Sequence, residues 1–173
     1  MDKIYFSKVK PNAIIPSKEK ENAGYDIYAC FKEDYMEIAP HETKLVPTGI
    51  AWASSEEYYL QIEERGSTGS KGIKKSAGVI DSGYRGEILI AINNATDKTL
   101  IISKLTEEEL STSYPQVIHT LVHKNYFIYP YSKAIAQGIV HRVIDLEVEE
   151  LTYDELLKIK SNRGMGGFGS SNK

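Results

Sequence analysis

Short apolar runs separated by turn residues recur along most of the chain, a pattern that is typical of β-strands. In the segment from residue 86 to 94, the apolar residues Ile88, Ile90 and Ile92 fall at every second position, which places them on one face of a strand. Six segments are predicted as strands: Ile4–Val9, Tyr25–Cys30, Lys44–Ala53, Tyr58–Glu63, Gly86–Asn94 and Ile135–Val148. Many short strands with turns between them favour an all-β sandwich or barrel.

Helical signals are short. Residues 106–109 and 152–155 both match a capping box, in which Thr is followed three residues later by Glu, and each predicts a helix of a few turns. The last residues are rich in Gly and Ser and carry two large apolar side chains. We therefore expect a single β-domain over residues 1–161 and a flexible C-terminal arm over residues 162–173.

Composition narrows the class of protein. A chain of 173 residues corresponds to one domain, and its 21 basic and 24 acidic residues argue against nucleic-acid binding through phosphate neutralisation. The single cysteine, Cys30, excludes an intrachain disulfide and leaves too few thiols for a zinc finger. No apolar run is long enough to cross a membrane, and the first residues lack the apolar core of a signal peptide. We expect a cytoplasmic protein that binds neither membrane nor nucleic acid.

Glycine and arginine are concentrated together. Ten of the 13 glycines lie in residues 66–86 and 164–169, and three of the four arginines, Arg65, Arg85 and Arg163, lie in or beside these windows. The planar guanidinium group binds phosphate and carboxylate through two parallel hydrogen bonds. The distribution therefore indicates binding of an anion.

Three segments are candidates for chemistry, and each also has a plain structural interpretation. Arg65–Gly72 combines backbone N–H groups, hydroxyls and cations that suit an anion, but a solvated loop has the same composition. Gly78–Glu87 places Asp81 at a strand end, where its carboxylate can accept a proton from water, although Asp and Gly are also ordinary turn residues. Arg163–Ser171 combines an arginine, glycines and one aromatic ring, which suits either a lid over a planar ligand or a disordered end.

Taken together, five segments resemble the five motifs of the trimeric dUTPase family, and they occur in the family's order. They span the chain from near its start to its end: Ala23–Ala29, Arg65–Lys71, Gly78–Glu87, Ala134–Gln137 and Arg163–Ser171. The resemblance implies a jelly-roll β-fold, a homotrimer with active sites shared between subunits, and the hydrolysis of dUTP to dUMP and pyrophosphate with Mg²⁺.

The resemblance also implies roles for individual residues. Asp81 corresponds to the general base that activates water for attack on the α-phosphorus, and Tyr84 corresponds to the residue that leaves no room for a 2′-hydroxyl. Asp26 and Gln137 match positions that reach the metal through water, so no direct protein ligand is expected. The remaining substrate-binding positions implied are Arg65, Gly66 and Ser67 for the phosphates, Gly78, Val79, Ile80 and Leu89 for uracil, Gln137 for the phosphate region, Arg163 for the γ-phosphate, and Phe168, Gly169, Ser170 and Ser171 for closure over the nucleotide.

The chain departs from the family pattern at a few places. Gly66 stands where a serine is usual, and Glu64 brings a negative charge next to the phosphates. Residues 104–131 form an insertion like that of phage-type members, and we expect it to be peripheral and available to a protein partner. The host cytoplasm is the expected location if the chain is encoded by a phage.

Two other functions compete with dUTP hydrolysis. The sister enzyme on the same fold, dCTP deaminase, needs a glutamate ten positions after Asp81, where this chain has Ala91. The other is a regulatory protein that binds a partner through the insertion, with catalysis retained or lost.

Overall fold

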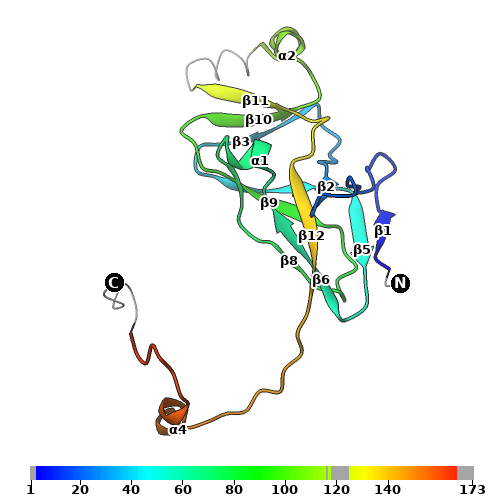
Figure 1. Cartoon of the computed structure of the whole chain (residues 1–173). Helices are drawn as coiled ribbons and strands as arrows, with labels where there is room; N and C mark the ends of the chain where they lie inside the picture. The colour runs from blue at the N-terminus through cyan, green and yellow to red at the C-terminus, as the bar shows by residue number, and fades with distance from the viewer. Residues whose placement is uncertain (1–2, 116, 118–124, 167–173) are drawn as a thin grey trace. The chain divides into compact units, whose positions relative to one another are not determined.

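The computed structural model describes residues 3–115, 117 and 125–166, and its contacts divide the chain into two units, Met1–Val143 and Ile144–Lys173 (Figure 1). The first unit is built almost entirely of β-strands with short helices, so the predicted all-β class is confirmed. Within the described residues, no helix has the length and apolar character needed to span a membrane.

One four-stranded antiparallel sheet carries several of the predicted site residues. Its strands, in spatial order, are β2 (Tyr25–Ile27), β12 (Ala136–Arg142), β6 (Tyr58–Glu63) and β8 (Val79–Ile80). The two central strands, β12 and β6, pair from Gln137 opposite Glu63 to Arg142 opposite Tyr58. Since β12 also pairs with β2, Gln137 lies between Glu63 and Asp26.

The other strands form three smaller sheets. They are β11 (Tyr126–Pro130), β10 (Thr99–Ser103) and β3 (Tyr35–Ile38) in one sheet, β4 (Thr43–Pro47), β9 (Leu89–Asn94) and β7 (Ile73–Lys75) in another, and β1 (Tyr5–Lys8) with β5 (Ile50–Ala53) in the last. Strands β10 and β11 run parallel, whereas all the other pairs are antiparallel.

The inward faces of these sheets meet in one apolar core. The predicted face of Ile88, Ile90 and Ile92 is confirmed, because all three side chains are buried. Trp52 and Tyr129 are the largest fully buried side chains of this core. Both carry a polar group, and each satisfies it: Trp52 Nε1 donates to the carbonyl of Asp81 at 3.2 Å, and Tyr129 Oη donates to the carbonyl of Ala134 at 2.7 Å.

Most predicted strands are shorter in the structure, and two of them differ in a way that affects the fold. The run from Lys44 to Ala53 breaks into β4 and β5 at Gly49, whose φ of +68° is costly for other residues and where a Cβ would lie 2.8 Å from Cys30 Sγ. The run from Ile135 to Val148 is paired only as far as β12. Beyond it the apolar side chains are exposed, with Val148 at 94%. The contacts therefore separate the second unit at residue 144, earlier than the predicted start of the arm at residue 162.

Both predicted capping boxes begin a helix. Helix α2 (Glu107–Ser113) starts after Thr106, and α4 (Tyr153–Lys158) in the second unit starts after Thr152; each Thr hydroxyl accepts a hydrogen bond from the backbone N–H of the Glu three residues on. A further helix, α1 (Gly66–Gly69), is a single turn that the sequence did not predict, because its glycines disfavour helix.

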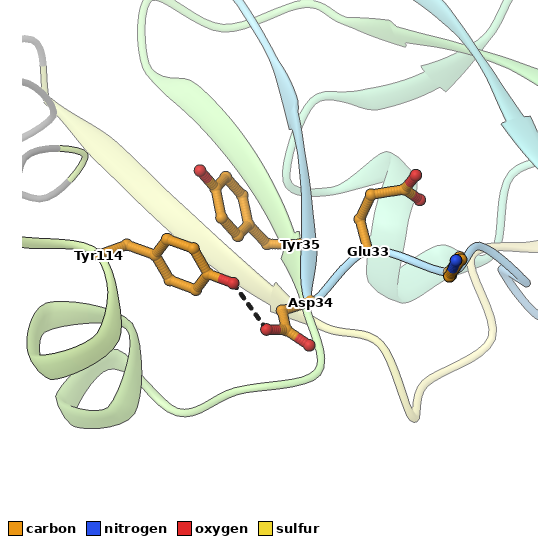
Figure 2. Close-up of a pocket in the computed structure, with 5 residues that line it drawn as sticks. Glu33, Asp34, Tyr35 and Tyr114 are labelled. Atoms are coloured by element: carbon orange, nitrogen blue, oxygen red, sulfur yellow. Dashed lines mark hydrogen bonds between the residues drawn. The ribbon is translucent and has the colours of Figure 1, made fainter.

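Helix α2 of the insertion packs on one face of the β11–β10–β3 sheet. Leu110 of α2 and Ile101 of β10 are the buried centre of a small apolar cluster there. Figure 2 shows the adjoining pocket, where Tyr114 Oη donates to Asp34 Oδ2 at 2.7 Å and the Tyr35 and Tyr114 rings meet edge to face at 5.2 Å. The hydrogen bond to Asp34 raises the pKa of Tyr114, so the hydroxyl stays a donor at neutral pH.

The expectation that residues 104–131 are peripheral is wrong for their last part. Strand β11 pairs with β10 along its whole length, and Tyr129 is only 1% exposed. The alternation along β11 explains this position, since Tyr126 and Ile128 face the α2 cluster while Phe127 and Tyr129 face the main core.

Candidate functional site

Three predicted motifs meet at one end of the four-stranded sheet. They line a pocket of about 480 Å³ formed by Glu21, Asn22, Ala23, Gly24, Asp26, Arg65, Gly66, Ser67 and Gln137. The register brings them together: Asp26 and Gln137 are neighbours across β2 and β12, and Arg65 follows the end of β6 beside them. Segments that lie about 40 and 70 residues apart in the sequence thus build one polar pocket.

Arg65 is fixed by a two-point interaction with Asp26. Its Nε lies 2.9 Å from Asp26 Oδ1 and its Nη2 lies 3.2 Å from Asp26 Oδ2. Nη1 of the same guanidinium donates to the carbonyl of Ala134 at 3.5 Å and to Ser67 Oγ at 3.4 Å. The two side chains remain about one-third exposed. The guanidinium is therefore oriented before any ligand arrives and is still accessible to one.

Gln137 is held on both sides. Its Nε2 donates to the carbonyl of Glu64 at 2.8 Å. On its other side it packs against Gly24, where a Cβ would lie 2.4 Å from Gln137 Oε1. Glycine at position 24 is thus required by close approach, and the amide oxygen of Gln137 is directed towards the first motif.

The Glu64 carboxylate is bound to the end of β7. It accepts a hydrogen bond from the backbone N–H of Lys75 at 3.1 Å. Partial burial acts to raise its pKa, but the hydrogen bond from Lys75 and the positive charges of Lys74 and Lys75 outweigh burial and lower it. The negative charge is therefore neutralised by two lysines and tied to the neighbouring strand.

The single turn of α1 is held to the backbone of Arg65 by the Thr68 hydroxyl. Thr68, fully buried, accepts from the backbone N–H of Arg65 at 3.0 Å and donates to the Arg65 carbonyl at 3.0 Å. Gly66 has open space around its Cβ position. Gly66 lacks the hydroxyl of the serine that is usual in the family, and Ser67 places a hydroxyl beside Arg65.

Tyr129 is a neighbour of this pocket that sequence analysis missed. Burial raises the pKa of its hydroxyl, and hydrogen-bonding contact with the Ser67 and Arg65 side chains acts in the opposite direction. The ring also lies beneath Lys71, whose Nζ is 5.8 Å from the ring centroid. The run of aromatic residues just before the fourth motif marks this segment in the sequence, but it does not show which of the side chains faces the pocket.

The predicted base lies in a different part of the same sheet. Asp81 follows β8 and is exposed; its backbone is fixed because its carbonyl accepts from Trp52 Nε1 at 3.2 Å and from the N–H of Tyr84 at 3.1 Å. The Asp81 carboxylate therefore projects from a rigid turn. That arrangement suits a group which must hold a water molecule in one direction.

Tyr84 lies in the same turn. Its hydroxyl donates to the carbonyl of Glu87 at 3.0 Å, and its ring covers Gly86, where a Cβ would lie 2.4 Å from Tyr84 Oη. The side chain is nevertheless 45% exposed, as are Val79 at 62% and Leu89 at 40%. Three large apolar groups thus surround the turn without being covered by their own chain.

The backbone of β8 is partly used within the sheet. The carbonyl of Gly78 accepts from the N–H of Ile62 at 2.7 Å, and Ile80 faces Leu60. Glycine is needed at position 78, because a Cβ there would lie 2.8 Å from the backbone carbonyl oxygen of Ile62.

Within one chain, the predicted base Asp81 and the pocket around Arg65 are far apart. Ile80 faces Leu60, which places Asp81 beside Tyr59, whereas Arg65 lies six residues further along the direction of β6. At a rise of about 3.3 Å per residue this separation is about 20 Å. The structure therefore brings Asp26, Arg65, Gly66, Ser67 and Gln137 together but does not bring Asp81 or Tyr84 to them.

The fifth motif belongs to the second unit. Arg163 is exposed, and its Nε donates to the carbonyl of Gly166 at 2.6 Å. The predicted residues Phe168, Gly169, Ser170 and Ser171 lie outside the described residues.

Comparisons with known proteins agree on one family. A sequence model of the dUTPase family matches residues 10–106. The deoxyuridine 5′-triphosphate nucleotidohydrolase of Nautilia profundicola is 31% identical over 178 residues, covering 99% of each chain. That of Wolinella succinogenes is 33% identical over 175 residues, covering 99% of this chain and 95% of its own.

Solved structures of phage enzymes share the fold. The dUTPase of Staphylococcus bacteriophage 80alpha with dUPNHPP superposes with a TM-score of 0.73 at 22% identity over all of both chains. The dUTPase of the S. aureus phage phi11 gives 0.64 at 18% identity over 87% of this chain and 96% of its own. The predicted jelly-roll fold and the predicted likeness to phage-type members are thereby confirmed, and the chain belongs to the dUTPase family.

Proposed function

We propose that this chain hydrolyses dUTP to dUMP and pyrophosphate. The observation that carries the proposal is the pre-oriented Arg65 guanidinium, which is bound by Asp26 on one edge and partly open to solvent in a polar pocket. Relatives that match almost the whole chain are named deoxyuridine 5′-triphosphate nucleotidohydrolases. Triphosphate hydrolysis depends mostly on positioning and on neutralising charge, and a fixed guanidinium provides both.

In this proposal the pocket binds the phosphates. Arg65, Ser67 and the N–H groups of the α1 turn contact phosphate oxygens, and Arg163 with the arm from residue 163 to 173 closes over them. Phe168 covers uracil, and Gly169, Ser170 and Ser171 complete the closure. Backbone groups of Gly78, Val79, Ile80 and Leu89 recognise the base.

Asp81 is the proposed general base. Its rigid turn holds a water molecule, and the carboxylate takes the proton as the water oxygen attacks the α-phosphorus and pyrophosphate leaves. Tyr84 lies against the sugar and excludes a 2′-hydroxyl.

Mg²⁺ is the proposed cofactor. The described residues contain no group of three or more His, Cys, Asp or Glu side chains placed to hold a metal ion, and both oxygens of Asp26 already accept from Arg65. This fits an ion held by phosphate oxygens and water, to which Asp26 and Gln137 contribute through water. When bound, Mg²⁺ neutralises charge on the triphosphate. A solved structure with a similar fold, that of a mutant dUTPase from phage phi11 of S. aureus, is described with a structural Mg(II) ion.

The active form is proposed to be a homotrimer with shared sites. The separation of about 20 Å between Asp81 and Arg65 along β6 is too great for one bound triphosphate to contact both in the same chain. A second chain must then supply Asp81 to the pocket of the first. The exposed Val79, Tyr84 and Leu89 are consistent with an area that a ligand and a neighbouring chain cover together.

The alternative of a dCTP deaminase is not favoured. Ala91 lies inside β9, pairs with Leu45 and is buried, so its position offers no proton-transfer group. A partner at the insertion remains a separate proposal, and the docked α2 helix gives it a defined surface. The proposed location is the cytoplasm, where nucleoside triphosphates are formed.

A panel of nucleotides tests the function. With Mg²⁺ present, pyrophosphate release is expected from dUTP and not from UTP, dCTP or dTTP, and removal of Mg²⁺ with a chelator should abolish it. Release of ammonia from dCTP would favour the deaminase instead, and no turnover of any nucleotide would favour a binding protein.

A further inference from the structure

Strand β11 provides a side chain that lies between the two ends of the loop from Arg65 to Lys71. Tyr129 is 1% exposed, its ring lies below the Lys71 ammonium group, and its hydroxyl donates to the Ala134 carbonyl that Arg65 also approaches. We propose that Tyr129 is a positioning residue that holds the phosphate-binding loop, and Arg65 above all, in the geometry that binds triphosphate. This inference rests on the function proposed above.

The hydrogen bonds support this role. Tyr129 Oη donates to the carbonyl of Ala134 at 2.7 Å, and Arg65 Nη1 donates to the same carbonyl at 3.5 Å. The Tyr129 hydroxyl and the Arg65 guanidinium therefore share one acceptor, and the hydroxyl fixes the carbonyl that Arg65 approaches. Burial raises the pKa of Tyr129, and the nearby Arg65 and Ser67 side chains act in the opposite direction.

The aromatic ring of Tyr129 supports the same role through Lys71. The ammonium group of Lys71 is 5.8 Å from the ring centroid, within the range of a cation–π interaction. Arg65 and Lys71 bracket the glycine-rich turn of α1, whose own residues provide few side chains for packing. A single buried aromatic residue therefore lies beside both ends of this loop, in addition to the contacts that Asp26 and Thr68 make with Arg65.

The same strand offers a matched control. Tyr126 also lies on β11, but it faces the opposite way and donates to Glu107 Oε1 of α2 at 2.7 Å. Tyr126→Phe removes one hydroxyl and one hydrogen bond, as Tyr129→Phe does, at a site away from the phosphate pocket.

The experiment compares two ligands on the assembled protein with Mg²⁺. A non-hydrolysable imido analogue of dUTP reports on the phosphate pocket, and deoxyuridine reports on the base site, both by calorimetry. Tyr129→Phe is expected to weaken binding of the dUTP analogue about tenfold, since it removes the hydroxyl that holds the Ala134 carbonyl beside Arg65, and to leave deoxyuridine binding within about twofold of wild type. Tyr126→Phe is expected to change neither.

Two outcomes would overturn the inference. If Tyr129→Phe binds the dUTP analogue as wild type does, the hydroxyl does not position the pocket. If it weakens both ligands equally, Tyr129 acts only through general stability. Tyr129→Met, which fills the space without a hydroxyl or a ring, provides a second variant and should show the same selective loss. Wild-type protein that binds neither ligand would instead refute the proposed function.

Discussion

The phosphate pocket and the loop from residue 81 to 88 between β8 and β9 differ in how completely one chain builds them. In the pocket, Arg65 and Gln137 are each held by two or more partners from other segments. In the loop, Asp81 has a rigid backbone and a free-standing carboxylate, and Tyr84 is 45% exposed. The pocket is thus pre-organised within the chain, whereas the loop presents its groups outwards, where a ligand and a second chain can meet them.

The largest effect is expected from removing the proposed base. Asp81→Asn should lower kcat for dUTP by roughly 10²–10⁴-fold, the usual contribution of general acid–base catalysis, while the fold and the affinity for a dUTP analogue are retained. Single-turnover kinetics and calorimetry measure the two quantities. Near-normal kcat in this variant would show that the water is activated by another group.

Mixing two inactive variants tests whether the pocket and the loop act across chains. Asp81→Asn lacks the base and Arg65→Ala lacks the guanidinium. Since each complete site is proposed to take these residues from different chains, random trimers formed from equal amounts should contain about one intact site in four. Denaturing the two proteins together and refolding them should therefore restore activity. Trimers that form without any recovery would place Asp81 and Arg65 in the same chain's site.

The residues that line the pocket are easier to predict from the sequence than the residues that hold them in place. Asp26, Arg65 and Gln137 are recognisable because each lies in a short motif of fixed composition. Tyr129 is not, since it belongs to a run of aromatic residues in which only the strand register decides which side chains face inwards. The orientation of Glu64 was also hidden, because its partner Lys75 lies 11 residues away on another strand.

The predicted strand from Ile135 to Val148 is longer than the observed β12 for a related reason. Apolar residues alternate with acidic ones from Ile144 to Val148, which is the signature of a half-buried strand. Among the described residues of this chain, however, no strand pairs with this segment, and its apolar side chains are exposed. A periodic pattern shows that a segment is suited to pairing but does not show which strand it pairs with.

A smaller effect is expected from removing the ring of Tyr84, which is proposed to contact the sugar of dUTP. Tyr84→Ala should reduce the ratio of kcat/KM for dUTP over UTP by about tenfold or more, because the ring no longer excludes the 2′-hydroxyl. Gly86→Ala is a subtler version: its new methyl group would collide with the Tyr84 hydroxyl and shift the ring without removing it. Its selectivity should fall between those of wild type and Tyr84→Ala. An unchanged ratio in both variants would move the discrimination to another residue.

The smallest effect concerns the support of the pocket and depends on pH. The folded protein holds the pKa of Glu64 below its ordinary value of 4.5, so the ionised carboxylate contributes stability above that value. This contribution is lost as the pH falls through the lowered pKa. Glu64→Gln should therefore be less stable than wild type at pH 7, and the difference should shrink towards pH 3, as measured by urea unfolding.

A control for the general loss of a negative charge is Glu56→Gln, at an exposed position just before β6. Because Glu64 faces two lysines and the Lys75 amide, only its variant should show a pH-dependent difference of this sign. Glu64→Gln should also weaken binding of the dUTP analogue slightly, since the Glu64 carbonyl accepts a hydrogen bond from Gln137 and Glu64 directly precedes Arg65. A difference in stability that persists unchanged to pH 3 would mean that the Glu64 side chain supports the loop by packing rather than by charge, and Arg65 would then be oriented electrostatically by Asp26 and not by the charge of Glu64.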